Sequence, residues 1–174
     1  MTNRLPLWIA VALCVAPAMA QQPPAPTPPP CATAAHRQFD FWLGEWEVRD
    51  GAGKRAGENR ITRIHNGCAL LEEWKGNGNV TGSSLNSYDQ ERGVWHQTWV
   101  DSGGNLLRLE GEYADGAMTL RGPHVERGPP EKASLQRIRW SVQPDGRVRQ
   151  LWESSADDGR TWTVTFDGWY ARKP

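Results

Sequence analysis

The chain has 174 residues, of which 38% are hydrophobic, and its 20 Lys and Arg balance its 20 Asp and Glu. This length suits one domain with a core of its own and is too short for two ordinary domains. Because the chain carries no excess of positive charge, we expect neither nucleic acid nor an anionic membrane surface as a partner.

Residues 1–20 have the features of a secretory signal peptide. Arg4 precedes an apolar run over residues 5–15, and residues 18–20 form a small-residue cleavage signal. The run is shorter than the ~20 residues that span a bilayer, which makes a membrane anchor the weaker alternative. We therefore expect a mature protein that begins at Gln21, is secreted or periplasmic, and has no stable membrane insertion.

Residues 21–35 are rich in proline and predict an extended, disordered tether. Cys31 lies within this tether, and after removal of the leader only Cys31 and Cys68 remain. Neither cysteine has a neighbour at a metal-ligand or CxxC redox spacing, and an even pair in an oxidising compartment favours a disulfide.

Residues 36–174 predict a single β domain. Residues 36–43 are suited to a short helix that plugs or covers one end of it. Beyond them no helical period persists, and short alternating segments are bounded by Gly, Asn and Asp. About ten strands are expected, over residues 45–50, 59–66, 69–75, 83–89, 94–101, 105–113, 117–121, 134–143, 147–154 and 161–170. The stretch 122–132 contains three prolines and predicts one long irregular loop.

Consecutive antiparallel strands in an open sheet would leave exposed edges, and closure into a barrel removes them. Gly44 and Trp46 form a G-x-W step at the start of the first strand. The glycine allows a tight turn, and the indole is expected to close one end of the barrel. Of ten tryptophans only Trp8 is lost with the leader, so the others are available to fill or line the interior.

The segment 155–162 matches the Asp-box pattern S-x-D-x-G-x-T-W, which is known from sialidases and many unrelated β proteins. Its role is structural. Asp157 is expected to accept hydrogen bonds from loop amides, Gly159 to adopt a positive φ, and Trp162 to pack beneath the hairpin. Sialidase chemistry is not inferred, because it requires an arginine cluster and a tyrosine nucleophile.

The signal peptide and the Asp-box segment occur together with F-D-F-W-L-G-E-W-E-V at residues 39–48 and W-H-Q-T-W-V-D at residues 95–101. In this combination the chain resembles a family of secreted bacterial proteins known as a domain of unknown function, which is similar to lipocalins and other calycins. The resemblance implies an all-β, calycin-like barrel that holds a small apolar ligand. In lipocalins an arginine of the last strand stacks on the G-x-W tryptophan, which implies Arg172 on Trp46.

Polar residues alternate along the central strands, so one set must face the lumen whichever register holds. Ser84, Asn86 and Tyr88 share one face, as do Gln97 and its neighbouring indoles, with His96 on the opposite face. Both registers stay open at this point. The candidate ligand-binding residues are Asn86, His96, Gln97, Trp99, Arg149 and Trp152.

No catalytic motif is recognisable. The chain has no nucleophile elbow, zinc-protease helix, phosphate loop or dinucleotide fingerprint, and its four histidines lack metal-ligand spacing. His96 beside Glu73 or Glu153 would be a candidate general base only if the fold brought them together. A haem barrel of the nitrobindin kind also starts with G-x-W, but its iron ligand is a histidine near the C-terminus, and none follows His124.

The sequence thus predicts a barrel that binds a small apolar or amphipathic molecule in a Trp-lined cavity, with no cofactor and no metal. Two alternatives remain: an enzyme acting in the same cavity, and an envelope interaction module that has no ligand. A lumen with converging polar groups would favour ligand binding or an enzyme. A lumen filled by side chains would favour the interaction module.

Overall fold

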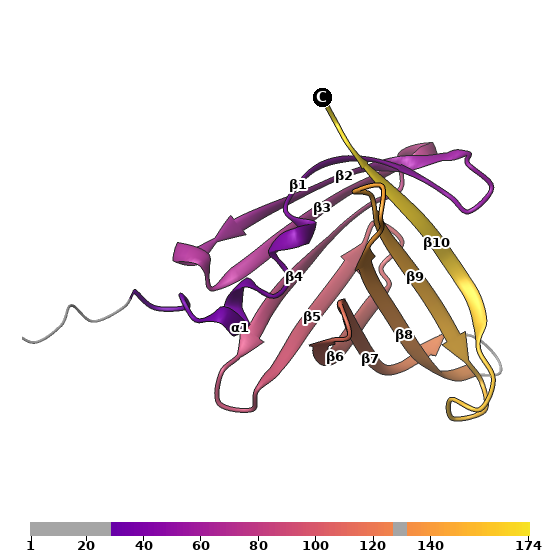
Figure 1. The fold of residues 1–174 in the computed structure, drawn as a ribbon. Helices are drawn as coiled ribbons and strands as arrows, with labels where there is room; N and C mark the ends of the chain where they lie inside the picture. Colours follow the sequence, from indigo (N-terminus) through magenta and orange to yellow (C-terminus); the bar gives the residue numbers. More distant parts are fainter. Residues whose placement is uncertain (1–28, 127–131) are drawn as a thin grey trace, which may run out of the picture.

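The computed structural model describes residues 29–126 and 132–174. Ten antiparallel strands form a closed barrel in which each strand pairs with the next and β1 pairs with β10 (Figure 1). The strands are β1 (Gly44–Arg49), β2 (Arg55–Ile64), β3 (Ala69–Gly76), β4 (Thr81–Asp89), β5 (Val94–Asp101), β6 (Leu106–Ala114), β7 (Ala117–Glu126), β8 (Lys132–Val142), β9 (Val148–Ser155) and β10 (Thr163–Arg172). The predicted fold class, a single all-β antiparallel barrel, is confirmed. The signal peptide and residues 21–28 of the tether lie outside the described residues.

The strands match the predicted ones in number and order, but the loop predicted over residues 122–132 is shorter than expected. Residues 122–126 continue β7 and pair with residues 132–136 of β8, with Pro123 opposite Leu135. Proline fixes φ near −65° and removes one N–H donor, so it weakens a ladder without preventing an extended backbone. The loop length predicted from the proline-rich composition was therefore too long.

The barrel closes where β1 meets β10, and the G-x-W step lies at this seam. Gly44 has a φ of 132°, and a Cβ there would lie 2.4 Å from Nη1 of Arg172. Arg172 pairs with Trp46 across the strands, and its guanidinium lies 4.4 Å from the centre of the indole ring. The Trp46 side chain is buried, and its Nε1 donates to the carbonyl oxygen of Trp42 at 3.0 Å. Gly44 and Trp46 thus lie at the closure of the barrel, and their structural role stays a prediction.

A short N-terminal segment closes the end of the barrel at which β1 starts. The helix predicted over residues 36–43 is divided into α1 (Ala34–Arg37) and a 3-10 turn, η1 (Asp40–Trp42). Between them, Phe39 is fully buried, stacks on Trp42 at 4.9 Å, and meets Trp95 of β5 and Trp140 of β8 edge-on. Because these two indoles come from different walls, Phe39 fills the lumen at this end.

A disulfide ties this segment to the turn between β2 and β3. Cys31 and Cys68 are bonded, as predicted. Arg37 reinforces the attachment, since its Nη2 donates to the carbonyl oxygens of Cys31 at 2.6 Å and Gly67 at 2.7 Å. This N-terminal segment, residues 31–42, is called the plug below. It is fixed to the barrel by a covalent bond and by hydrogen bonds.

The Asp-box forms the loop between β9 and β10. Asp157 accepts hydrogen bonds from the backbone amide of Thr161 at 2.8 Å and from its hydroxyl at 2.6 Å. Gly159 has a φ of 85°, and Nε1 of Trp162 donates to its carbonyl oxygen at 3.0 Å. Asp157, Gly159 and Trp162 are thus tied to one another within this loop, and their structural role stays a prediction. Residues 161 and 162 complete the loop, so β10 starts later than predicted.

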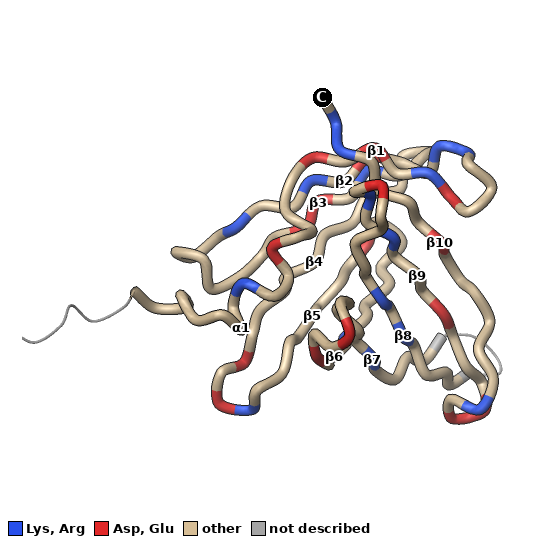
Figure 2. The backbone as a smooth tube through the Cα atoms, in the orientation of Figure 1, with Lys and Arg blue, Asp and Glu red and all other residues tan. Residues whose placement is uncertain are grey.

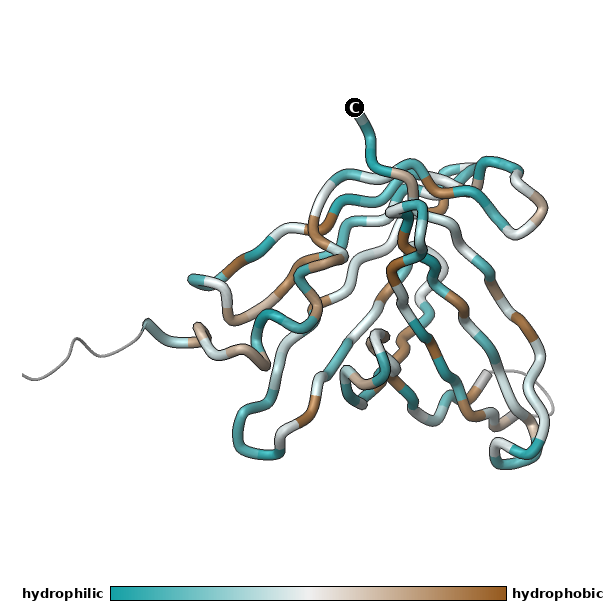
Figure 3. Tube along the Cα trace, in the orientation of Figure 1, coloured by the Kyte–Doolittle hydropathy of each residue, from teal (hydrophilic) through white to brown (hydrophobic). Residues whose placement is uncertain are grey.

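Basic and acidic residues are interspersed along the strands and loops of the barrel (Figure 2). Three arginines on the strands pair with acids on neighbouring strands, Arg60 with Glu73 at 3.4 Å, Arg137 with Glu153 at 2.8 Å and Arg149 with Asp167 at 2.7 Å. Hydropathy changes from residue to residue along many of the strands, as expected when alternate side chains face a core (Figure 3). No helix within residues 29–126 and 132–174 is long and apolar enough to cross a membrane.

Candidate ligand-binding site

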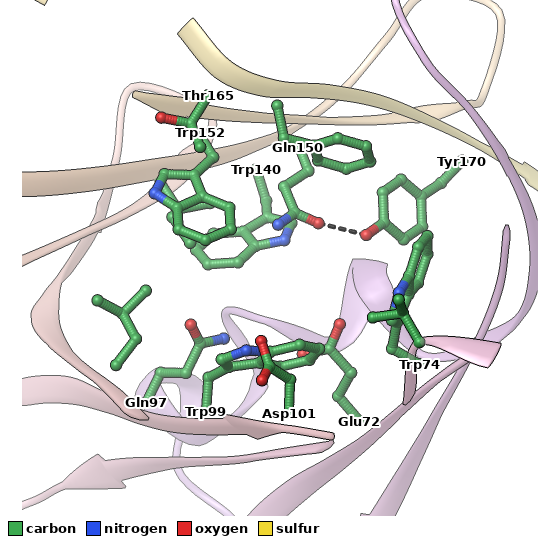
Figure 4. A pocket seen from close by; sticks show the side chains of 14 residues that line it. Glu72, Trp74, Gln97, Trp99, Asp101, Trp140, Gln150, Trp152, Thr165 and Tyr170 are labelled. Atoms are coloured by element: carbon green, nitrogen blue, oxygen red, sulfur yellow. Dashed lines mark hydrogen bonds between the residues drawn. The ribbon is translucent and has the colours of Figure 1, made fainter. Parts of the chain in front are cut away.

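A cavity of about 310 Å³ occupies the lumen on the far side of the plug. Its walls come from strands on opposite sides of the barrel (Figure 4). One side presents Glu72, Gln97, Trp99 and Asp101, and the other presents Trp140, Gln150, Trp152 and Tyr170. The remaining lining residues are Trp74, Val80, Leu107, Ile138, Thr165 and Phe166.

Glycines make room for the aromatic wall of the cavity. A Cβ at Gly82 would lie 2.3 Å from two ring atoms of Trp99, and one at Gly168 would lie 2.4 Å from the ring of Phe166. Such distances are far below van der Waals contact, so these rings lie directly against the backbone of the barrel. An aromatic ring held against the wall leaves the middle of the lumen open.

A polar network forms the floor of the cavity around Glu72, which is buried. Its Oε1 accepts from Nδ2 of Asn59 at 2.7 Å, and its Oε2 accepts from Oγ of Ser84 at 2.6 Å. Ser84 in turn accepts from Nδ2 of Asn86 at 2.8 Å, and Asn86 accepts from Nε2 of Gln97 at 2.8 Å. The network fixes the orientation of the carboxylate and of the Gln97 amide.

The opposite wall carries a second set of polar contacts. The Tyr170 hydroxyl donates to Oε1 of Gln150 and accepts from Nδ2 of Asn59 at 3.4 Å. Nε1 of Trp140 is buried and has no hydrogen-bond partner among the described residues. A buried N–H without a partner is costly, and a bound molecule or water would satisfy it.

Burial raises the pKa of Glu72 from 4.5 to about 7, although the hydrogen bonds from Ser84 and Asn59 act in the opposite direction. Burial also raises the pKa of Tyr170 well above its ordinary value, and the nearby charge of Glu72 adds to this effect. Burial raises the pKa of Asp101 too, but hydrogen bonds from Asn105 and from the Gly103 amide outweigh it, so that pKa is lowered overall. At neutral pH the cavity lining therefore holds a partly ionised Glu72 and an ionised Asp101.

Four of the six predicted ligand-binding residues lie on the lumen side. Gln97, Trp99 and Trp152 line the cavity, and Asn86 is buried next to Gln97 within the polar network. The side chains of these four residues come from three strands, β4, β5 and β9.

His96 and Arg149 lie on the outer face and are not part of the cavity lining. The ring of His96 contacts Oε1 of Glu110 at 3.2 Å and Oγ1 of Thr98 at 2.8 Å. Arg149 pairs with Asp167 and lies 5.2 Å from the ring of Trp169. Successive residues of a strand face opposite sides, so an inward Gln97 requires an outward His96, and an inward Gln150 requires an outward Arg149.

The sequence interpretation did not identify Glu72, Gln150 or Tyr170 as cavity residues. It considered Glu73 and Glu153 as partners of His96, but both face outward, towards Arg60 and Arg137. The alternation in β3 could have identified Glu72 as a cavity residue, because an inward Trp74 requires an inward Glu72 two residues earlier.

Within the described residues, no group of three or more His, Cys, Asp and Glu side chains has a geometry that could hold a metal ion. No protein-family model matches the chain, and no curated protein matches it significantly. Inference about function therefore depends on the chemistry of the cavity itself.

Proposed function

We propose that this protein binds a small, partly apolar molecule in its Trp-lined cavity. The observation that carries the proposal is a cavity of about 310 Å³ whose walls combine indole rings with converging amide, carboxyl and hydroxyl groups. Binding sites for small molecules have this composition, in which apolar walls supply affinity and a few polar groups fix orientation. A lumen filled by side chains would instead have favoured an interaction module without a ligand.

The site of action in this proposal is the periplasm or the extracellular space. The predicted signal peptide and the Cys31–Cys68 disulfide support it, because structural disulfides persist in oxidising compartments. Membership of the secreted bacterial family that the chain resembles is part of the same proposal, and the closed barrel with Arg172 over Trp46 is compatible with it.

An enzyme acting in the same cavity is the second candidate. Glu72 favours it, because a carboxyl with a pKa of about 7 exchanges protons readily at neutral pH. A structural network also perturbs pKa values, so this single group supports catalysis less strongly than the cavity supports binding.

Titration with N-phenyl-1-naphthylamine, a neutral apolar fluorophore, tests the proposed function. We expect saturable binding that quenches tryptophan emission, since four indoles line the cavity. Gln97→Glu should weaken binding because it places a poorly solvated carboxylate beside the probe. His96→Glu is the matched control, since it makes the neighbouring change on the outer face and should bind like the parent.

Circular dichroism would establish that both variants are folded. Absence of saturable binding to the parent protein would overturn the proposed function and favour the interaction module. Equal binding by the parent and a folded Gln97→Glu variant would show that the probe does not occupy this cavity.

A further inference from the structure

The charged groups that line the cavity are all acidic. Glu72 and Asp101 are lining residues, whereas no Lys or Arg side chain is among the lining residues of the described chain. On two of the strands that form the walls, arginines point outward and pair there, Arg137 of β8 with Glu153 and Arg149 of β9 with Asp167. An anionic ligand would therefore meet two carboxyl groups and no counter-charge.

Glu72 is a buried carboxyl without a cationic partner. It accepts two hydrogen bonds from neutral donors, Asn59 and Ser84, and makes no ion pair within the described residues. An ionised group in this setting loses much of its hydration, and a cation beside it would return part of that loss. Figure 4 shows the carboxyl of Glu72 pointing into the cavity, where a ligand can approach it.

The aromatic wall provides a second attraction for positive charge. Trp74, Trp99, Trp140 and Trp152 line the cavity together with Phe166 and Tyr170. The face of an aromatic ring attracts an ammonium group within about 6 Å, most strongly for tryptophan, and the attraction grows when water is excluded. Pockets that recognise quaternary ammonium ligands combine several such rings.

From the acidic lining, the unpaired Glu72 and the ring of indoles, we infer that the cavity selects organic ammonium cations over neutral or anionic molecules of the same shape. This inference rests on the proposed function, that the cavity binds a ligand at all. The cationic nitrogen would lie beside Glu72 and the neighbouring indole rings, and the apolar part of the ligand would extend towards Trp152 on the opposite side of the cavity (Figure 4).

Three competitors of similar shape test the inference by displacing N-phenyl-1-naphthylamine. They are benzyltrimethylammonium, its neutral carbon isostere neopentylbenzene, and the anion phenylmethanesulfonate. We expect the cation to displace the fluorophore at a concentration about tenfold or more below that of the isostere, with the anion weakest. Equal or better displacement by the isostere or the anion would overturn the inference while leaving the proposed function intact. If the fluorophore itself does not bind, the proposed function fails first.

Glu72→Gln assigns the effect to one side chain, because it removes the charge and retains the shape. The ratio of cation affinity to isostere affinity should fall about tenfold in this variant. Glu73→Gln is the matched control, as Glu73 is the next residue on β3 but faces outward, with a side chain that is 50% exposed. An unchanged ratio in Glu72→Gln would overturn the role assigned to Glu72.

The pH dependence of the parent protein keeps the inference testable should Glu72→Gln fail to fold. The other titratable groups that line the cavity are Asp101, whose pKa is lowered, and Tyr170, whose pKa is raised well above its ordinary value. Between about pH 6 and about pH 8 only Glu72 therefore changes its charge in the lining, and cation preference should rise several-fold over this interval. A preference that stays constant would count against Glu72 as the counter-charge.

Discussion

Replacement of Glu72 by glutamine should change stability in a pH-dependent way. The free energy of unfolding of the variant, relative to that of the parent, should increase as the pH rises. The pKa of Glu72 is raised from 4.5 to about 7 by burial. Between these values the folded state binds more protons than the unfolded state, so parental stability falls as the pH rises through this window. Glutamine does not titrate, and the variant escapes this loss.

The magnitude follows from the two pKa values. Each unit of difference corresponds to about 1.4 kcal/mol, and integration between about pH 5 and about pH 8 gives a change of about 2 to 3 kcal/mol. The free energy of unfolding of Glu72→Gln minus that of the parent should therefore increase by about 2 to 3 kcal/mol over this interval. The other carboxyl groups titrate in both proteins, so their contributions cancel in the difference.

Urea unfolding, followed by tryptophan fluorescence with the disulfide intact, measures this quantity at both pH values. Glu73→Gln serves as the control, because Glu73 is half exposed and lies 3.4 Å from Arg60 on the outer face. A difference between Glu72→Gln and the parent that does not change with pH would refute the reasoning. An equal change in Glu73→Gln would show that the effect is not specific to the buried carboxyl.

Three further substitutions test the architecture around the cavity. Trp46→Ala should lower the free energy of unfolding by about 3 to 5 kcal/mol, because it removes a buried indole from the seam, and an unchanged melting temperature would contradict that role. Cys31→Ser should cost about 4 kcal/mol in the chain-entropy model, for a loop whose ends are 37 residues apart. The intact mass of the exported parent should lack residues 1–20 and two thiol hydrogens. Gly82→Ala should cost about 1 to 3 kcal/mol and change the near-ultraviolet circular dichroism, since the added methyl group displaces Trp99; an identical spectrum would argue against the observed packing.

The strands and their ends were largely predictable from the sequence, because both depend on local chemistry. Turn residues such as Asn66 and Gly67 and the pair Asp115 and Gly116 adopt positive φ at or near the predicted boundaries. The clearest departure is β7, where Pro123 lies inside a strand. Its extension depends on pairing with β8, which is a long-range contact that local composition does not report.

The candidate site was predictable only in part, because the face that a residue occupies depends on how the whole barrel closes. Alternation divides each strand into two sets of side chains but does not say which set faces the lumen. On β5 the two sets contain Gln97 and His96, and both are polar enough to bind a ligand. The choice is made by Trp95, which is buried against Phe39 of the plug and fixes Gln97 and Trp99 on the same side.

A rule that every indole faces the lumen would have identified Glu72 through Trp74, but the same rule fails on β10. Trp169 lies on the outer face, where the guanidinium groups of Arg147 and Arg149 approach its ring at 4.7 and 5.2 Å. Its neighbour Tyr170 is buried instead. An indole on the outside of this barrel is covered by arginine, and Arg137 over Trp162 at 3.9 Å follows the same pattern.

The indoles of the cavity lack such a cover. No arginine lies over the rings of Trp74, Trp99, Trp140 or Trp152 among the cation–π contacts of the described residues. Glycine backbone backs one face of Trp99, which leaves the opposite face of the ring towards the lumen. The outer indoles thus already hold the cations that their rings attract, whereas those of the cavity are free to attract one from solution, next to a carboxyl that has no cationic partner of its own.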